Sequence, residues 1–389
     1  MRLLWVSNGH GEDVIGARLV KTFQSLKPEF SHTILPLVGL GGPYRGLPGV
    51  ELLDPTRQLP SGGFSGRSPR FLWQDLKAGL LGLTREQRKT LSGQRQDAMV
   101  VVGDIFALFM ATAAPVEPRV FLPTAKSDHI APHLGWEVRY MRKHATRVLA
   151  RDAQTAASLA EQGVPAGYVG NVMMDAISPQ GVDFGLKAGH TVAILPGSRQ
   201  EAAANTALLL EAALELTGAL GEHVNFLLSR SPQLELGQLT AELPDSWQLQ
   251  EGRGPVEAVI RRQGTEVLVS TYFSDIISQA QLVFGMAGTA NEQAAGLGKP
   301  IVACPGTGPQ FTERFLWGQA RLLGEAVAKV ERDPVALATE ALAILQDPER
   351  YRAMAARGRE RMGEPGATVR MVEIIAQVAR AGILPPGGE

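Results

Sequence analysis

Short runs of apolar residues alternate with longer amphipathic stretches along almost the whole chain. The apolar runs are rich in Val, Ile and Leu and have few polar positions, which is the pattern of strands covered on both faces of a sheet. Because helical patterns separate them, the alternation predicts an α/β protein with parallel sheets and helices on either side. The predicted strands are residues 2–7, 33–37, 98–102, 120–122, 147–150, 167–169, 190–195, 224–228, 266–269, 282–284 and 300–303.

Two series of strands and helices follow one another, separated by a polar, Gly- and Pro-containing stretch at residues 178–190. Such a composition is typical of a linker. The 389 residues are enough for two domains with cores of their own. We therefore expect domains at 1–178 and 190–362. Helical patterns fill the rest of the chain, at 333–347, 348–362 and 366–382.

The composition narrows the class of protein. Hydrophobic residues make up 44% and charged residues 20%, which is ordinary for a globular protein. With 38 Lys and Arg against 39 Asp and Glu, nothing indicates a nucleic-acid partner. The single cysteine, Cys304, excludes a disulfide framework or a cysteine zinc site and favours the cytoplasm. We expect it to be buried at a strand end.

Neither the first residues nor the most apolar stretch indicates a membrane or export signal. The opening "MRLLWVS" is too short for a signal peptide and leads into Gly, His and acids. Residues 99–116 are the most apolar, but Gly103 and Asp104 interrupt them. This interruption favours a buried strand, a turn and a buried helix over a membrane span.

Ligands of open α/β sheets bind beyond the carboxyl ends of the strands, and "NGHGEDVIGA" follows the first strand. Gly9 and Gly11 would let a substrate approach the backbone, and the helix that begins there directs its amides to the same place. A dinucleotide fingerprint would need Gly at position 14, which is Val, so a nicotinamide cofactor is not indicated. His10 and Asp13 are candidates for a base or for hydroxyl binding. Alternatively, they are a turn residue and a first-turn acid.

Asp104 follows the strand at 98–102 and lies between apolar segments. A carboxylate in such surroundings needs partners, or its pKa rises. A raised pKa at a strand's carboxyl end suits a general base. The alternative is an N-cap for the helix from Ile105, and the two roles are compatible.

The segment "PGSRQEAAANT" follows the strand at 190–195. Pro196 and Gly197 predict a tight turn, and Ser198 with Glu201 has the spacing of a capping box. The cap does not explain Arg199, a cation in the positive first turn of the helix. An anion bound beside it would, because the planar guanidinium binds two phosphate oxygens at once.

The segment "GMAGTANEQAAGLGKP" follows the strand at 282–284. Gly288, Thr289 and Ala290 form a second open turn before a helix, which is a candidate diphosphate cradle. Glu292 and Gln293 lie about one turn further on and could reach ribose hydroxyls. The alternative is a helix that packs through its alanines, which is compatible with this role.

Together these segments resemble lipid-A-disaccharide synthase and, more distantly, other nucleotide-sugar glycosyltransferases of the GT-B fold such as the peptidoglycan N-acetylglucosaminyltransferase. "ILPGSRQEA" matches the family's Leu-Pro-Gly-Ser-Arg motif and is the most specific segment. "AGTANEQAAGLGKPIVA" is similar to its Ser-Gly-Thr-Ala segment, and "NGHGEDVIGARL" to its first turn and helix. "ARDAQTAASLAEQGVPAGYVGNVMMDAI" is similar to the segment ending in Gly-His-x-Met-x-Asp-Ala. The order is the same, and the resemblance covers most of the chain.

The resemblance implies a GT-B fold of two Rossmann-like domains, with the last helix, 366–389, returning to the first. It implies a nucleotide-sugar donor bound mainly by the second domain, an acceptor held by the first, and an inverting reaction without a metal or a cofactor. Asp104 corresponds to the aspartate considered as general base, and His10 and Asp13 are the other candidate catalytic residues. Gly9, Gly11 and Asn171 lie on the acceptor side. The donor-binding residues would be Gly197, Ser198, Arg199, Phe273, Gly288, Thr289, Ala290, Asn291, Glu292, Gln293 and Gln310.

The departures from the family pattern matter for the substrate. The ribose-binding glutamate falls on Gln293, with Glu292 adjacent, so either could hold the ribose of a UDP-sugar. Gly170-Asn171 replaces the family's Gly-His pair, and residues 122–136 do not match the Trp-rich acceptor segment. We therefore expect a related glycosyltransferase acting on a lipid-linked or glycolipid acceptor, and not the lipid A enzyme itself. The alternatives are a nucleotide-sugar epimerase of the same fold and a non-catalytic sugar-nucleotide binding protein.

A lipid acceptor would require contact with a membrane, and residues 61–89 are the candidate element, at the inner face of the plasma membrane. Phe64 lies in its Gly/Ser-rich first part. We expect an apolar helical stripe to pack on the first domain: Leu72, Trp73, Leu76, Leu80 and Leu83. Basic residues with Phe71 and Leu81 among them would face an anionic bilayer: Arg70, Lys77, Arg85, Arg88 and Lys89. The alternative is the solvated face of a surface helix.

Overall fold

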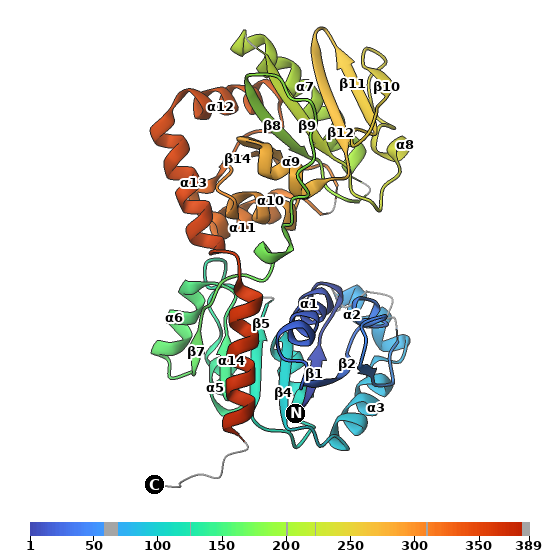
Figure 1. Cartoon of the computed structure of the whole chain (residues 1–389), viewed down its shortest axis with the longest axis vertical. Helices are drawn as coiled ribbons and strands as arrows, with labels where there is room; N and C mark the ends of the chain where they lie inside the picture. The colour runs from blue at the N-terminus through green and yellow to red at the C-terminus, as the bar shows by residue number, and fades with distance from the viewer. Residues whose placement is uncertain (58–68, 125, 200, 222, 309, 383–389) are drawn as a thin grey trace. The chain divides into compact units, whose positions relative to one another are not determined.

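The computed structural model describes residues 1–57, 69–124, 126–199, 201–221, 223–308 and 310–382, apart from the side chains of His10 and residues 69–72. The chain forms two compact units, here called unit 1 and unit 2. Unit 1 comprises residues 1–172 and the chain from residue 365 onward, and unit 2 comprises residues 173–364. Figure 1 shows the elements of each unit.

The segment 178–190 was expected to be a linker, but it belongs to unit 2. The backbone N–H groups of Gln180 and Val182 donate to the buried Asp275 carboxylate at 2.9 and 3.0 Å. Further along, Asn225 pairs with both backbone groups of Lys187. These bonds fasten the polar segment to the unit 2 sheet, so its composition does not mark the boundary.

Unit 1 is built on a parallel sheet with the strand order β3-β2-β1-β4-β5-β6-β7. Apolar side chains form a core cluster on each of its faces. The strands are β1 (Arg2–Ser7), β2 (Ser31–Pro36), β3 (Val50–Leu52), β4 (Ala98–Gly103), β5 (Arg119–Pro123), β6 (Arg147–Leu149) and β7 (Ala166–Gly167). The helices are α1 (His10–Leu26), η1 (Gly42–Tyr44), α2 (Pro69–Lys77), α3 (Leu80–Ser92), α4 (Ile105–Ala111), α5 (Gly135–His144), α6 (Ala153–Glu161) and α14 (Ala367–Ala381).

The last helix, α14, packs against α1 in unit 1, as Figure 1 shows. Val372, Ile375 and Ala379 supply its buried face. Lys27 at the end of α1 pairs with Glu373 at 3.0 Å. The apolar burial therefore joins the end of the chain to the sheet that contains its beginning.

Unit 2 has the strand order β10-β11-β12-β9-β8-β13-β14-β15, and its strands pair in parallel from β12 to β15. The strands are β8 (His190–Leu195), β9 (Val224–Ser229), β10 (Gln248–Glu251), β11 (Ala258–Arg262), β12 (Thr265–Ser270), β13 (Leu282–Gly285), β14 (Ile301–Ala303) and β15 (Val327–Lys329). The helices are η3 (Met174–Ala176), α7 (Ala202–Leu220), α8 (Leu236–Leu239), α9 (Phe273–Gln279), α10 (Thr289–Gly296), α11 (Glu313–Leu323), η4 (Gly324–Ala326), α12 (Pro334–Gln346) and α13 (Pro348–Met362).

The antiparallel part of unit 2 was not predicted. Strands β10 and β11 pair antiparallel with each other and with β12. Gln263 and Gly264, with φ of 48° and 86°, form the hairpin turn between β11 and β12. The sequence of β10, "QLQE", is mostly polar and each of its residues is exposed, so hydrophobic patterning could not indicate it.

The apolar stretch 99–116 folds as predicted into a strand, a turn and a helix. Gly103 ends β4 with φ of 155°, and a Cβ atom there would lie 2.7 Å from the Cβ of Asn8. Close packing of two turns therefore explains the glycine that interrupts the stretch. Within the described residues, no helix has both the length and the apolar character needed to cross a membrane.

The prediction for residues 72–83 is wrong in its orientation. Two helices form in place of one, because Gly79 adopts φ of 92° between α2 and α3. Trp73 is 58% exposed and Leu76 is also exposed, whereas Leu83 is buried as expected. Leu81 lies outside, as predicted, at 72% exposure. Phe64 and the rest of 61–68, together with the side chains of Arg70, Phe71 and Leu72, lie outside the described residues.

Candidate functional site

In unit 2, two turns meet at the carboxyl ends of the central strands β8 and β13. The N–H of Met286, just after β13, donates to the carbonyl oxygen of Leu195 at the end of β8, at 2.8 Å. Gly197 has φ of 100°, and a Cβ atom there would lie 3.2 Å from the Met286 carbonyl oxygen. The glycine therefore allows both the turn after β8 and its close approach to the turn after β13.

The capping box predicted for Ser198 and Glu201 does not form. Helix α7 begins at Ala202, and the Ala202 N–H donates to the Arg199 carbonyl oxygen at 2.9 Å, so Ser198 and Arg199 precede the helix. The Glu201 carboxylate accepts the backbone N–H groups of Gln310, at 2.5 Å, and Phe311, at 3.2 Å. The acid is therefore engaged by the loop after β14.

Arg199 and Gln310, both predicted as donor-binding residues, are brought together although 111 positions separate them. The Arg199 Nη1 group donates to the Gln310 Oε1 atom, and both side chains are exposed. Because a guanidinium has five N–H donors, this bond leaves Arg199 able to bind an anion as well.

The second predicted cradle, after β13, forms a turn that leads into α10. Gly288 is the N-cap of α10, Thr289 is exposed and Ala290 is half-buried. A Cβ atom at Gly288 would lie 3.5 Å from the ring of Phe315 in α11. The turn therefore presents backbone amides beside an aromatic ring.

Two buried side-chain amides, those of Asn291 and Gln319, hydrogen-bond to the backbone of this turn. Asn291 is fully buried, and its Nδ2 group donates to Gly285 O at 3.1 Å and to Gln319 Oε1 at 2.9 Å. Gln319 in turn donates to the carbonyl oxygens of Ala287 and Gly288 at 3.2 and 3.0 Å. Asn291 was predicted to bind the donor; its side chain holds the turn in shape, and its part in donor binding stays a prediction. Gln319 was missed, although an amide on the apolar face of α11 is a signal for such a role.

The remaining predicted donor residues lie deeper or further along the sheet. Glu292 and Gln293 are nearly buried, and Gln293 Nε2 donates to the Met173 carbonyl oxygen at 2.9 Å. Phe273 begins α9 after β12 and packs partly against the unit 2 core. Strand β9 separates β12 from β8, so Phe273 follows a strand that is not adjacent to the Arg199 turn.

In unit 1, Asp104 follows β4 and caps α4. Its Oδ1 atom accepts the N–H groups of Phe106 and Ala107 at 3.0 and 3.1 Å, and the Asn8 amide at 2.8 Å. Burial raises the pKa of Asp104, and the backbone N–H bonds oppose that rise. The capping role is therefore confirmed, while the base role remains a prediction. Asn8 was missed by the sequence analysis.

Asp13 lies in the first turn of α1, and the residue is only 1% exposed. The Ser7 hydroxyl donates to its Oδ1 atom at 2.5 Å, and the Tyr44 hydroxyl donates to Ser7 Oγ at 3.1 Å. Burial raises the pKa of Asp13 to about 7. A Cβ atom at Gly16 would lie 2.0 Å from the Tyr44 hydroxyl, so the glycine makes room for this cluster. The burial of Asp13 does not support the expected contact with a substrate.

Of the other predicted acceptor-side residues, Gly9 and Gly11 lie at this turn, whereas Asn171 follows β7, which three strands separate from β1. Gly9 is the N-cap of α1, Gly11 has open space around it, and Asn171 is nearly buried. His10 begins α1, but its side chain lies outside the described residues. The half-buried Glu12 accepts a hydrogen bond from the Thr124 hydroxyl after β5, at 3.4 Å, so this edge of the sheet has an acid that the sequence analysis passed over.

Among the described residues, no group of three or more His, Cys, Asp or Glu side chains could hold a metal ion. Cys304 is buried at the end of β14, as predicted, and burial raises the pKa of its thiol to about 11.

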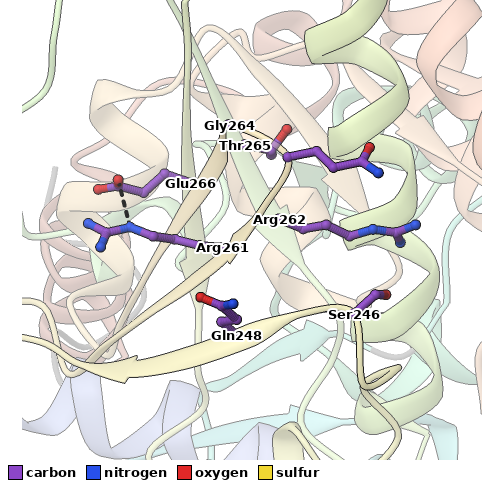
Figure 2. A pocket seen from close by; sticks show the side chains of 8 residues that line it. Ser246, Gln248, Arg261, Arg262, Gly264, Thr265 and Glu266 are labelled. Atoms are coloured by element: carbon purple, nitrogen blue, oxygen red, sulfur yellow. Dashed lines mark hydrogen bonds and ion pairs between the residues drawn. The ribbon is translucent and has the colours of Figure 1, made fainter.

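A hollow of about 360 Å³ lies on the antiparallel strands of unit 2, away from the two turns. Figure 2 shows Arg261 in this hollow, bonded to Glu266 at 2.9 Å. Its neighbour Arg262 pairs with Glu211 at 2.6 Å. Because both cations have acidic partners, and because the hollow contains none of the predicted site residues, we do not assign the site to it.

No protein-family model matches the chain. The chain is 24% identical over 293 residues to lipid-A-disaccharide synthase of Pseudomonas fluorescens, covering 69% of this chain and 72% of that protein. The structure is similar to MurG of Acinetobacter baumannii, with a TM-score of 0.59, 16% identity, and 97% and 99% of the two chains covered.

The structure is also similar to the UDP-GlcNAc 2-epimerase of Neisseria meningitidis bound to UDP-GlcNAc, with a TM-score of 0.55, 14% identity, and 97% and 100% of the two chains covered. At these identities the similarity establishes the fold. The predicted GT-B fold of two Rossmann-like α/β units is therefore confirmed.

Proposed function

We propose that this protein is an inverting glycosyltransferase that moves a sugar from a UDP-sugar to a lipid-linked or glycolipid acceptor. The observation that carries the proposal is the meeting of the Arg199 and Gly288 turns on adjacent strands of unit 2. An exposed guanidinium on one turn and the backbone amides that begin α10 on the other are groups that bind a diphosphate. The resemblance to lipid-A-disaccharide synthase favours UDP as the nucleotide.

In the proposed reaction, Asp104 removes the proton of the acceptor hydroxyl. The acceptor oxygen then attacks the anomeric carbon on the side opposite the diphosphate, the bond to the diphosphate breaks, and the configuration inverts. Arg199 and the turn amides stabilise the charge on the leaving diphosphate. All three bonds to Asp104 described above end on Oδ1, so we assign the proton to Oδ2. The raised pKa of this carboxyl group suits the role.

A lipid acceptor fits the surface of unit 1. Trp73, Leu81 and Phe109 are exposed apolar residues on the neighbouring helices α2, α3 and α4. Lys77 lies 3.5 Å from the centre of the Trp73 ring, and Arg88 lies 4.7 Å from that of Phe109. Cations interleaved with exposed rings support contact between this surface and an anionic bilayer.

The decisive test is UDP affinity measured by calorimetry. Arg199→Ala should weaken binding at least about tenfold, because a charge-assisted pair contributes roughly 1.5–3 kcal/mol. The UDP affinity of Arg199→Lys should lie between those of wild type and Arg199→Ala, since lysine keeps the charge but lacks the planar guanidinium. Arg253→Ala, which removes an exposed arginine elsewhere in unit 2, is the control. Equal affinity of Arg199→Ala and wild type would refute the assignment of the donor site.

The similarity to a 2-epimerase supports a second candidate, a nucleotide-sugar epimerase. Incubation with donor alone separates the two enzymatic functions, because an epimerase changes the sugar without an acceptor. Tight UDP-sugar binding with neither epimerised nor transferred product would favour a non-catalytic binding protein.

A further inference from the structure

Residues of the loop after β14 contact the side chain of one acidic residue, Glu201. Both carboxylate oxygens of Glu201 accept backbone N–H groups of this loop, from Gln310 and Phe311. The Gly306 N–H donates to the Phe311 carbonyl oxygen at 2.7 Å, which holds these two residues together beside the acid. A Cβ atom at Gly308 would lie 2.1 Å from Glu201 Cγ. Gly308, Gln310 and Phe311 therefore all lie against the Glu201 side chain.

Pro305, at the start of the same loop, is linked through Arg332 to Asn205 in α7. Arg332 donates to the Pro305 carbonyl oxygen at 3.1 Å and reaches Asn205 Oδ1 at 3.5 Å. The other side of that amide, Asn205 Nδ2, donates to the Pro196 carbonyl oxygen at 3.0 Å. Asn205 is buried in α7, so this contact is internal to the fold. The loops after β8 and β14 are thus linked at two places.

We propose that Glu201 is a positioning residue of the donor site: it holds Gln310 and Phe311 beside Arg199, so that the residues after β8 and those after β14 bind the diphosphate together. The inference rests on the proposed function, because it takes the Arg199 turn as the diphosphate site. Gln310 transmits the effect, since its N–H binds Glu201 while its side chain accepts from Arg199.

The arrangement also explains an acid next to a site for an anion. A carboxylate there would repel a diphosphate through space. Two N–H donors on Glu201 partly balance its charge, and its hydrogen bonds are used to order the loop. Ordering Arg199 and the loop before the ligand arrives lowers the entropy cost of binding.

The test compares UDP affinity in Glu201→Ala, Glu201→Gln and wild type. Glu201→Ala should bind UDP about ten- to a hundredfold more weakly, because it removes both hydrogen bonds to a charged acceptor. Glu201→Gln keeps one acceptor oxygen and should lose less. Glu215→Ala, which removes an exposed acid from α7, the helix that Glu201 precedes, is the matched control. A purely structural role would lower the melting temperature without ligand while leaving the affinity of the folded protein unchanged.

A second variant approaches the same contact from the loop. Gly308→Ala places a methyl group against the Glu201 side chain and should weaken UDP binding when Glu201 is present. In the double variant with Glu201→Ala the obstacle is gone, so the addition of Gly308→Ala should cause little further loss. Fully additive losses would overturn the inference, as would wild-type affinity in Glu201→Ala. Failure of wild type to bind UDP would instead reject the proposed donor site itself, and this inference with it.

Discussion

At the residue scale, Asp104 caps helix α4 and is also the proposed general base. Its Oδ1 atom is occupied by two helix N–H groups and by Asn8. These bonds fix the carboxyl group at the end of β4, so a proton transfer would use a pre-oriented Oδ2. The cap could be predicted from the sequence, whereas Asn8 could not, because its contact with Asp104 spans 96 positions.

Asp104→Asn should separate the two roles. The asparagine oxygen can still accept the N–H groups of Phe106 and Ala107, so the fold and UDP affinity should persist. Transfer of the sugar should fall about 10²–10⁴-fold, the usual contribution of a positioned base. Both quantities are to be measured on the same preparation. Near-normal transfer would show that Asp104 is a cap alone.

Two buried titratable residues in unit 1 should make opposite contributions to stability. Burial lowers the pKa of His32 from 6.5 to about 4 and raises that of Asp13 from 3.8 to about 7. For His32 the unfolded chain binds more protons between pH 4 and 6.5, so its contribution is lost as the pH falls through that window. For Asp13 the folded chain binds more protons between pH 3.8 and 7, so its contribution to stability is lost as the pH rises. In wild type, these two opposite effects of pH on the free energy of unfolding should nearly cancel.

Asp13→Asn should leave the effect of His32 on the pH dependence of stability without its opposing effect. At about 1.4 kcal/mol per pKa shift of one unit, the stability of this variant relative to wild type should increase by about 3–4 kcal/mol from pH 4 to pH 7. His32→Gln should show the opposite trend, by about 3 kcal/mol, over the same range. Urea unfolding at several pH values measures both. A constant difference between Asp13→Asn and wild type would contradict the raised pKa.

At the element scale, the strands and turns of the candidate site were predictable because buried parallel strands leave a strong apolar pattern. The start of α7 was not, since Ser198 and Glu201 have a capping-box spacing while Glu201 binds backbone 109 positions further on. The orientation of α2 and α3 was missed for a related reason. A single helical period was assumed across Gly79, whose left-handed conformation breaks it.

The exposed face of α2, α3 and α4 leads to a prediction about membranes. Wild type should sediment with anionic liposomes at low salt and be released at high salt, because each cation near the surface contributes roughly 1 kcal/mol. Charge reversal at Lys77, Arg85 and Arg88 should abolish binding. Trp73→Ala with Leu81→Ala should weaken it while leaving its salt dependence. Wild type that stays in the supernatant at low salt would favour an acceptor that is not membrane-bound.

At the scale of the whole molecule, the alternation of strands and helices was enough to predict two α/β domains. It could not show that residues 178–190 pack on unit 2, because that packing depends on the distant acceptors Asp275 and Asn225. Unit 2 is one uninterrupted stretch of chain, and it has its own apolar core. Unit 1 needs both ends of the chain, since α14 packs on α1.

Because unit 2 is one continuous stretch of chain whereas unit 1 needs both ends, we expect residues 173–364 to fold and to bind UDP without the rest of the chain. The fragment contains both turns, Arg199, Glu201 and the loop after β14, and it has the core that a domain of this size requires. Its UDP affinity, measured by calorimetry, should lie within about threefold of that of the full chain, and ligand should raise its melting temperature. The same fragment with Arg199→Ala serves as the control. A folded fragment that does not bind UDP, beside a full chain that does, would show that unit 1 contributes directly to the donor site.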